Sequence, residues 1–331
     1  MRRAKAAGLV LAAFTMTACV HAAGPAAGAP PAMNALDVFQ QKEDALFRIG
    51  YRLAAANAPF CTRTTPSAGL LIHDAAAYGN PEAVRRNFAL TGDIGVQSVA
   101  PGSPADLAGI RQNDTLESLG GRDIAQTWRP GKPAWQRAQD IREALEQGLA
   151  AAPVDITWTD SSGTPRAGVL AAEPVCATRF ELIASSDDAS ADGERVLVGE
   201  KFPGFAYAED ELAAMVAHEM AHNLLGHLTT FETTGRKRKL VRLSERDADR
   251  LMPWLLANAD YDPAAAARFM RQWGPRHGGW IFRKRTHDGW DERVDFIEAE
   301  LPLIAAAKAS DGTADWRTNF RPELDTALAT N

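Results

Sequence analysis

The stretch from Glu211 to His227 constrains the fold of this chain more than any other segment. It reads ELAAMVAHEMAHNLLGH and consists mainly of Ala, Met, Leu and Val at helical spacing. A helix that is apolar nearly all round its circumference belongs in a protein core. This helix also carries two histidines and a glutamate, and each of these polar groups needs a partner when it is buried. The chain must therefore fold so that other segments satisfy these side chains.

The polar residues of this helix have the spacing of a metal site. His218 and His222 lie four residues apart, so both imidazoles share one helix face and can bind the same ion. Glu219 can hold a water beside that ion, as in zinc-dependent hydrolysis. His227, five residues after His222, rotates away from this face, and we expect it at the surface near the helix end. Two core histidines satisfied by hydrogen bonds are the alternative interpretation.

The best candidate for a third ligand lies in the sequence SERDAD that begins at Ser244. Ser244 and Asp247 have the spacing of a capping box, which predicts that a helix begins there. Glu245 and Asp249 then share one face of that helix. One carboxylate can bind zinc while the other accepts the N–H of a ligating histidine. An ordinary acidic helix start is the alternative.

Together these segments resemble a known peptidase family. H-E-x-x-H followed by E-x-x-A-D is the signature of the gluzincin peptidases that include HtpX and the CAAX prenyl protease. The resemblance continues through Tyr261-Asp262-Pro263, through Thr286-His287 and through Glu292-Arg293-Val294. It covers approximately residues 175 to 300. Asp288 departs from the family pattern, which usually has proline at this position.

The resemblance implies an α+β fold with a mostly helical, gluzincin-type metalloprotease domain and a small sheet. The edge strand of that sheet, near residues 191–193, would hold an extended substrate. One zinc ion per chain would be bound by three side chains, namely His218, His222 and Glu245. Glu219 would act as the general base and His287 as an auxiliary group near the developing oxyanion. Asp249 would orient a ligating histidine, and Arg293 would brace the site.

A second resemblance concerns the segment from about residue 82 to residue 173, where the pattern becomes β-rich. Residues 94–99 alternate like a strand, and the following PGSPA, AGI and DTL sequences resemble the bacterial PDZ pattern. A PDZ groove adds a peptide as a strand and holds its C-terminal carboxylate on backbone N–H groups. The candidate loop for this carboxylate is Thr91, Gly92, Asp93 and Ile94. A spacer with a closed groove is the alternative, because Asp93 would repel a carboxylate.

The N-terminus predicts export. A basic start, MRRAK, precedes an apolar run that ends at Ala18 and is too short to span a bilayer. The sequence MTAC resembles a bacterial lipoprotein cleavage box, in which Cys19 would carry the lipid. An ordinary secretory signal is the alternative. We therefore expect a periplasmic protein that touches the outer membrane only through a lipid anchor.

Composition agrees with this interpretation. The 331 residues are 46% hydrophobic and carry a net charge of −6, which favours about two domains with real cores and gives no reason to expect nucleic acid. An exposed loop explains the basic run 236–239 more simply than a polyanion site does. If Cys19 is lipidated, Cys61 and Cys176 remain as an even pair and predict a disulfide. Two reduced thiols are the alternative.

The sequence thus predicts a zinc endopeptidase that cleaves extended or unfolded polypeptides in the bacterial envelope. A chaperone-like protein that binds such polypeptides with little cleavage is one alternative, and a structural zinc site is another. The predicted parts are a signal peptide (1–19), a flexible tether (20–33), an N-terminal part of the protease domain (34–81), a PDZ-like domain (82–173), the catalytic domain (174–308) and a C-terminal tail (309–331).

Overall fold

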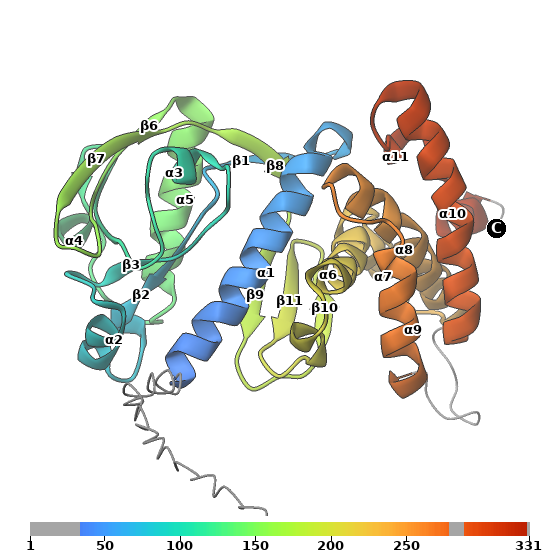
Figure 1. The fold of residues 1–331 in the computed structure, drawn as a ribbon, viewed down its shortest axis with the longest axis horizontal. Helices are drawn as coiled ribbons and strands as arrows, with labels where there is room; N and C mark the ends of the chain where they lie inside the picture. Colours follow the sequence, from blue (N-terminus) through green and yellow to red (C-terminus); the bar gives the residue numbers. More distant parts are fainter. Residues whose placement is uncertain (1–33, 278–287, 330–331) are drawn as a thin grey trace, which may run out of the picture. The chain divides into compact units, whose positions relative to one another are not determined.

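The computed structural model describes residues 34–277 and 288–329 (Figure 1). Of these residues 54% are helical and 18% lie in strands, so the fold belongs to the mixed α+β class that the sequence predicted. The chain divides after Asn34, and the part that begins at Ala35 forms one unit. None of the described helices has the length and hydropathy of a membrane span. The predicted signal peptide, the tether and Cys19 lie outside the described residues.

The described helices are α1 (Ala35–Asn57), α2 (Pro81–Phe88), α3 (Pro104–Leu107), α4 (Ile124–Thr127), α5 (Gln136–Ala151), α6 (Glu209–Leu224), α7 (His227–Thr234), α8 (Arg238–Asn258), α9 (Ala265–His277), α10 (Trp290–Asp311), α11 (Trp316–Asn319) and α12 (Glu323–Ala329). The strands are β1 (Thr64–Ser67), β2 (Leu70–Asp74), β3 (Ile94–Val99), β4 (Thr115–Leu119), β5 (Arg122–Asp123), β6 (Val154–Thr159), β7 (Pro165–Leu170), β8 (Glu173–Cys176), β9 (Arg179–Ile183), β10 (Ala189–Ala191) and β11 (Arg195–Gly199).

A helical core forms around α6 and α8. The buried residues of α1, α6, α8, α9 and α10 belong to one hydrophobic cluster, in which Trp254 of α8 is fully buried. The indole N–H of Trp254 donates a 2.9 Å hydrogen bond to Glu300 of α10. A three-stranded sheet in the order β10-β11-β9 packs against α1 and α6. This sheet leaves β10 as an edge strand beside α6.

Residues 70–170, here called the sheet segment, build a second core. Their strands follow the order β2-β3-β4-β6-β7, with β5 paired to β4, and bury Val96 and Trp158 beneath α5. The antiparallel ribbon of β1 and β8 carries the chain out to this segment and back. A disulfide joins Cys61 to Cys176 at the base of the ribbon, which confirms the predicted pair. Because β2 pairs with β3, the segment begins earlier than the predicted boundary at residue 82.

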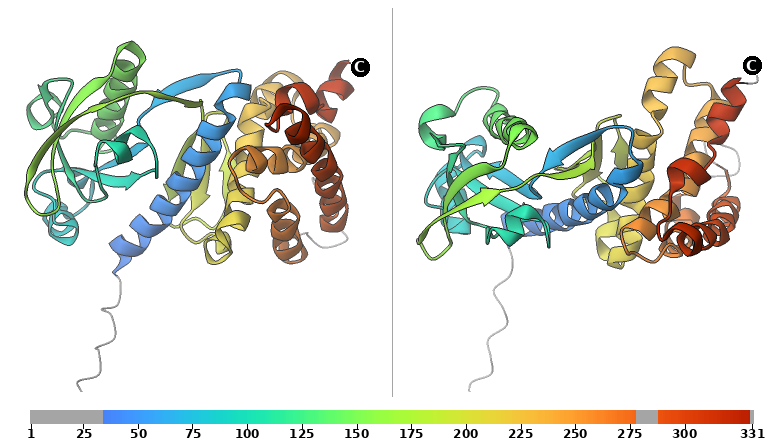
Figure 2. Two further views of the ribbon diagram at one scale, coloured as in Figure 1. Left: turned by 45° about the horizontal axis from the view of Figure 1, so that its top comes forward. Right: turned by 90° about the horizontal axis from the view of Figure 1, so that it is seen from above.

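Helix α1 contacts both cores, as the two views of Figure 2 show. Its apolar face, which includes Leu46 and Leu53, is fully buried in the helical core. Its other face is polar and meets β3, where Gln97 donates a 2.6 Å hydrogen bond to Glu43. Helix α1 therefore connects the two cores.

Most elements that the sequence predicted are present, but the predicted start of α8 is wrong. Helix α8 begins at Arg238, so Ser244 lies inside the helix and is fully buried. Its hydroxyl donates to the carbonyl oxygen of Val241 at 2.8 Å, which is how a serine is satisfied within a helix. The helix extends upstream of Ser244 to Arg238, so the spacing of Ser244 and Asp247 does not mark a helix start here.

The C-terminal tail, which the sequence left unassigned, folds back onto α8. Trp316 and Phe320 belong to the hydrophobic cluster of the helical core, and Leu324 is buried as well. The Asp247 carboxylate accepts the backbone N–H groups of Glu323 and Leu324 at 2.8 and 2.9 Å and so caps the first turn of α12. Burial raises the pKa of Asp247 to about 6. The tail therefore fixes the position of the helix that carries the third predicted ligand.

His73 of β2 is buried without a hydrogen-bond partner. Its side chain is 7% exposed, and neither ring nitrogen has a partner among the described residues. The ring packs edge-on against Tyr78 and Phe88. Burial lowers the pKa of His73 to about 4 from the usual 6.5. Between pH 6.5 and pH 4, His73 binds a proton in the unfolded chain but stays neutral in the folded chain. The free energy of unfolding is therefore highest above pH 6.5 and decreases as the pH falls toward 4.

Replacing His73 with phenylalanine should reduce this loss of stability in acid. The wild-type free energy of unfolding should fall, relative to that of His73→Phe, by up to about 3 kcal/mol between pH 7 and pH 4. Urea unfolding of both proteins at several pH values in this range measures the difference. A difference that stays constant with pH would show that His73 titrates normally in the folded protein.

Candidate metal centre

Helix α6 presents His218 and His222 on one face. The middle of the helix is buried, because residues such as Val216, Ala217 and Met220 pack into the core. The two Nε2 atoms lie 3.3 Å apart. Tetrahedral zinc with bonds of about 2.0–2.1 Å to nitrogen separates two ligand atoms by roughly 3.3–3.4 Å. The two imidazoles therefore have the separation that a shared zinc ion requires.

Helix α8 brings Glu245 to the same point. Its carboxylate oxygens lie 3.5 Å from Nε2 of His218 and 3.7 Å from Nε2 of His222. The ligand atoms of all three side chains lie within 4.8 Å of one another. Two neutral nitrogen donors and one carboxylate are a donor set that suits zinc. The three side chains predicted as ligands thus lie together, although they come from two separate helices.

Asp249 and Arg293 support this cluster from the protein interior. Asp249 is fully buried, and its Oδ1 lies 3.1 Å from Nδ1 of His218. Arg293 of α10 donates two hydrogen bonds of 2.6 and 2.7 Å to the Asp249 carboxylate. Burial alone would raise the pKa of Asp249, but the charges of Arg293 and His218 outweigh burial and lower this pKa. An ionised Asp249 can therefore orient His218, as predicted.

His227 contacts His222, and the prediction that His227 lies at the surface is wrong. Gly226 adopts a left-handed conformation (φ 65°) that ends α6, and α7 then begins at His227. His227 is 3% exposed, and its Nδ1 lies 2.8 Å from Nδ1 of His222. The prediction applied the rotation of a continuous helix to His227, although Gly226 already indicated that the helix ends, and the reversal at Gly226 turns His227 back toward His222. The left-handed glycine between the two histidines was the signal in the sequence.

The electrostatics of the cluster favour a cation. Burial lowers the pKa of His218, but hydrogen bonds with Asp249 and Glu245 outweigh burial and raise this pKa to about 10. Burial lowers the pKa of His222 to about 4, so this ring is neutral. Three carboxylates, those of Asp249, Glu245 and the half-buried Glu219, act on the guanidinium of Arg293. A proton on a histidine or a divalent ion offsets the excess negative charge.

The cluster opens into a cleft of about 260 Å³. Edge strand β10 lines one wall, and α7 with the first turn of α8 lines the other. Asn223 of α6 fixes the turn that joins β10 to β11, because its side chain accepts the backbone N–H of Gly193 at 2.7 Å and donates to the carbonyl of Arg195 at 3.0 Å. The predicted edge strand near residues 191–193 therefore lies beside the candidate ligands.

His287 lies outside the described residues. The residue that follows it, Asp288, accepts two hydrogen bonds of 2.8 and 3.0 Å from Arg246. Arg246 is the neighbour of Glu245 on α8, and it also pairs with Glu323 of α12 at 2.9 Å. The acidic residue that departs from the family pattern is thus tied to the helix that carries the third candidate ligand.

The predicted peptide-binding loop of residues 91–94 does not form a carboxylate nest. The Asp93 carboxylate pairs with Arg85 at 2.6 Å and with Arg137 at 3.0 Å. Ile94 begins β3, which is paired with β2 on one side and with β4 on the other. A strand that is paired on both sides cannot accept an added peptide. The open edges of this sheet are instead those of β2 and β7, and β2 lies beside α5.

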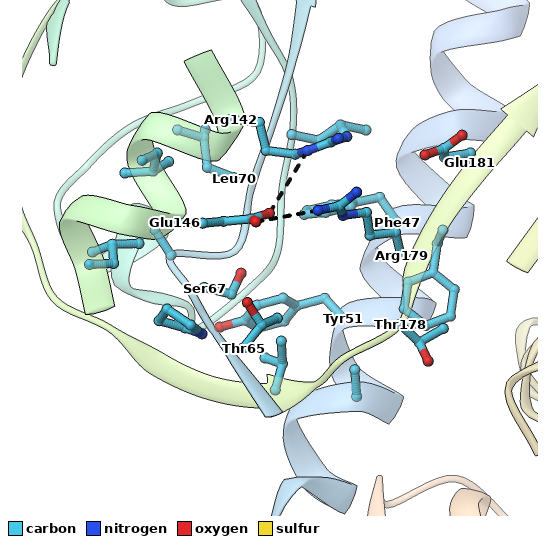
Figure 3. Close-up of a pocket in the computed structure, with 18 residues that line it drawn as sticks. Phe47, Tyr51, Thr65, Ser67, Leu70, Arg142, Glu146, Thr178, Arg179 and Glu181 are labelled. Carbon is cyan, nitrogen blue, oxygen red and sulfur yellow. Dashed lines mark hydrogen bonds and ion pairs between the residues drawn. The ribbon is translucent and has the colours of Figure 1, made fainter. Parts of the chain in front are cut away.

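A groove follows this open edge, between β2 and α5. One cavity of about 110 Å³ lies at the C-terminal end of α5, and another of about 490 Å³ lies along the same face of β2. Leu70, Leu71 and Leu145 line both cavities. Figure 3 shows the smaller cavity, where Glu146 lies between Arg142 and Arg179. The groove is mainly apolar with one charged cluster, and β9 and α1 contribute its other wall.

No protein-family model, curated protein or solved structure matches this chain. The interpretation of the site therefore depends on its donor atoms, their distances and the charges around them. These agree with a metal ion that is held by two imidazoles and one carboxylate.

Removal of the His227 imidazole should weaken metal binding. We expect His227→Ala to raise the dissociation constant for Zn²⁺ by about 10- to 100-fold, because His222 loses the hydrogen bond that fixes its ring. His227→Gln, which keeps a polar partner, should lose less. Competition with a fluorescent zinc chelator measures both constants. Thr229→Ala, at an exposed position of α7, is the matched control, and equal affinity in His227→Ala and the control would contradict the role of His227.

Proposed function

We propose that this chain is a zinc-dependent endopeptidase that cleaves extended or unfolded polypeptides. The observation that carries the proposal is the meeting of His218, His222 and Glu245 in a cleft that Glu219 also lines. The helical core would be a gluzincin-type catalytic domain. The sheet segment would be a PDZ-like domain inserted into its chain.

Three protein ligands favour a catalytic zinc site over a structural one. Structural sites usually have four protein ligands, whereas catalytic sites keep one position for water or substrate. Within the described residues the candidate group has three members. When bound, zinc supplies a positive charge that polarises a carbonyl group and lowers the pKa of water.

The side chains of this chain would divide the remaining work. Glu219 would take the proton from the attacking water and deliver it to the leaving amine. Asp249 and His227 would hold the two ligating imidazoles in place through their Nδ1 atoms. Arg293 would keep Asp249 ionised. The predicted role of His287 near the oxyanion remains part of the proposal.

The edge strand beside the site indicates the class of substrate. β10 pairs with β11 on one side only, so its other edge can accept an extended chain through main-chain hydrogen bonds. A folded protein rarely offers such a free strand, whereas an unfolded polypeptide does. The substrate would therefore be recognised by its extended backbone.

The disulfide supports an oxidising compartment. Bridges such as Cys61–Cys176 persist in the bacterial periplasm and are rare in the cytosol. Together with the export signal in the sequence, this supports a periplasmic protein that Cys19 would anchor to the outer membrane through a lipid.

Glu219→Gln should separate catalysis from binding. Glutamine keeps the size of the side chain but cannot accept the proton, so casein hydrolysis should fall by about a thousandfold or more while one zinc per chain is retained. Metal analysis and digestion of labelled casein are the measurements. Glu232→Gln, an exposed substitution on α7, is the control.

Undiminished hydrolysis by Glu219→Gln would refute the assigned base. If the zinc-loaded wild type does not cleave, and both proteins prevent the aggregation of unfolded polypeptides equally, the chaperone-like function is supported instead.

A second function is favoured by the groove along β2. An open strand edge beside apolar cavities is the arrangement in which a PDZ-like domain holds the C-terminus of a polypeptide. A fluorescent peptide with an apolar, free C-terminus should bind to the wild type and lose at least about fivefold in affinity with Leu145→Gln. Leu107→Gln, at an exposed position of the same segment, should not change the affinity. Equal binding of the amidated peptide would show that the C-terminal carboxylate is not recognised.

A further inference from the structure

The basic run 236–239, which the sequence assigned to an exposed loop, begins in the wall of the catalytic cleft. Gly235 adopts a positive φ of 74° and ends α7, and α8 begins at Arg238. Arg236 lies between them and lines the cleft together with His218 and Glu219. One member of the run is therefore placed where a bound substrate would pass.

Arg236 has no acidic partner in the described parts of the chain. Its guanidinium lies 5.4 Å from the centre of the Phe231 ring, and this cation–π contact is the interaction that the structure gives it. Most of the other arginines close to the site are paired, as Arg195 is with Asp192 and Glu181. Because an arginine gains most from a bidentate carboxylate or phosphate partner, Arg236 has capacity for an anionic ligand.

The charges of the residues that line the cleft favour an anionic group of the substrate next to Arg236. Apart from the histidines of the candidate metal centre, the other charged residues that line the cleft in the described part of the chain are Glu219 and Glu245, which belong to the same centre. The remaining lining residues are neutral, and they include Ser190, Phe231 and Leu228. Among the described residues, a substrate side chain in the cleft therefore meets a single cation outside the metal centre, that of Arg236. The exposed Lys237 and Lys239 of the same run add to the positive potential around it.

We propose that Arg236 binds a carboxylate of the substrate and so determines the specificity of the proposed peptidase. This inference rests on the function proposed above. A cleft of this volume has room for only a few residues, so the carboxylate lies within about three residues of the cleaved bond in an extended chain. It can belong to an Asp or Glu side chain or to the C-terminus of the polypeptide. The pairing holds the chain in register along β10.

Matched fluorogenic peptides test this inference. Glu, Gln or Lys is placed in turn at each of the three positions on either side of the cleaved bond, and each peptide is made with a free and with an amidated C-terminus. At one position the wild type should hydrolyse the Glu peptide with about tenfold higher kcat/KM than the Gln peptide. This preference should decrease as the salt concentration rises.

Substitutions at Arg236 should change the preference in a graded way. Arg236→Gln should bring the Glu/Gln ratio close to one, Arg236→Lys should keep part of it, and Arg236→Glu should favour the Lys peptide. Lys239→Gln removes the same charge from an exposed position that does not line the cleft, and it should leave the ratio unchanged. An equal fall of the ratio in Lys239→Gln would show that the general potential of the run is responsible, which would overturn the assignment to Arg236.

A binding measurement separates recognition from cleavage. In the Glu219→Gln background, the Glu peptide should bind about tenfold more tightly than the Gln peptide by fluorescence anisotropy, and Arg236→Gln should remove this difference. A preference in amidated peptides assigns the carboxylate to a side chain. Faster hydrolysis of the free peptides than of the amidated ones, whatever side chain they carry, assigns it to the chain end, and both results support the proposal when Arg236→Gln removes them.

Two further outcomes overturn the inference in distinguishable ways. If the wild type hydrolyses the Glu, Gln and Lys peptides equally at every position, and the free and amidated forms equally as well, Arg236 does not determine specificity, while the peptidase function stands. If the zinc-loaded protein hydrolyses none of the peptides, the proposed function is wrong and the specificity inference fails with it.

Discussion

The rest of the site depends on the buried pair of Asp249 and Arg293. A fully buried carboxylate is tolerated in a core only when its charge is paired and its oxygens accept hydrogen bonds. This pair joins α8 to α10, and the same carboxylate reaches His218 on α6. Because Glu245 lies one turn before Asp249 on α8, fixing Asp249 also fixes Glu245 opposite the two imidazoles. Three helices are thus positioned by one carboxylate.

The sequence predicted correctly those features that depend on the regular spacing of residues within one helix or strand. The four-residue spacing of His218 and His222, and the same spacing of Glu245 and Asp249, was enough to place each pair on one helix face. Alternation of apolar residues likewise predicted the strand at residues 94–99, and the even pair of Cys61 and Cys176 predicted the disulfide. These features need only the geometry of one element or simple counting, so a single sequence contains them.

Features that depend on how elements meet could not be obtained in this way. The inward position of His227 requires the chain to reverse at Gly226, and the burial of Ser244 requires α8 to start six residues earlier. The predicted loop at residues 91–94 failed as a peptide site because β3, which begins at Ile94, is paired on both sides, and these pairings join separate parts of the chain. Likewise, the sequence did not indicate what the basic run 236–239 lies next to, and only the fold places Arg236 at the cleft.

The ribbon of β1 and β8 has a consequence for how such a chain can change. Its two strands leave the helical core side by side, and the bridge between Cys61 and Cys176 holds their base although 115 residues separate the two cysteines in the sequence. The helical core therefore meets the same pair of neighbouring chain ends whatever length of polypeptide connects them. An inserted segment between such paired strands can become longer, be replaced or be lost during evolution while the path of the chain through the helical core stays the same.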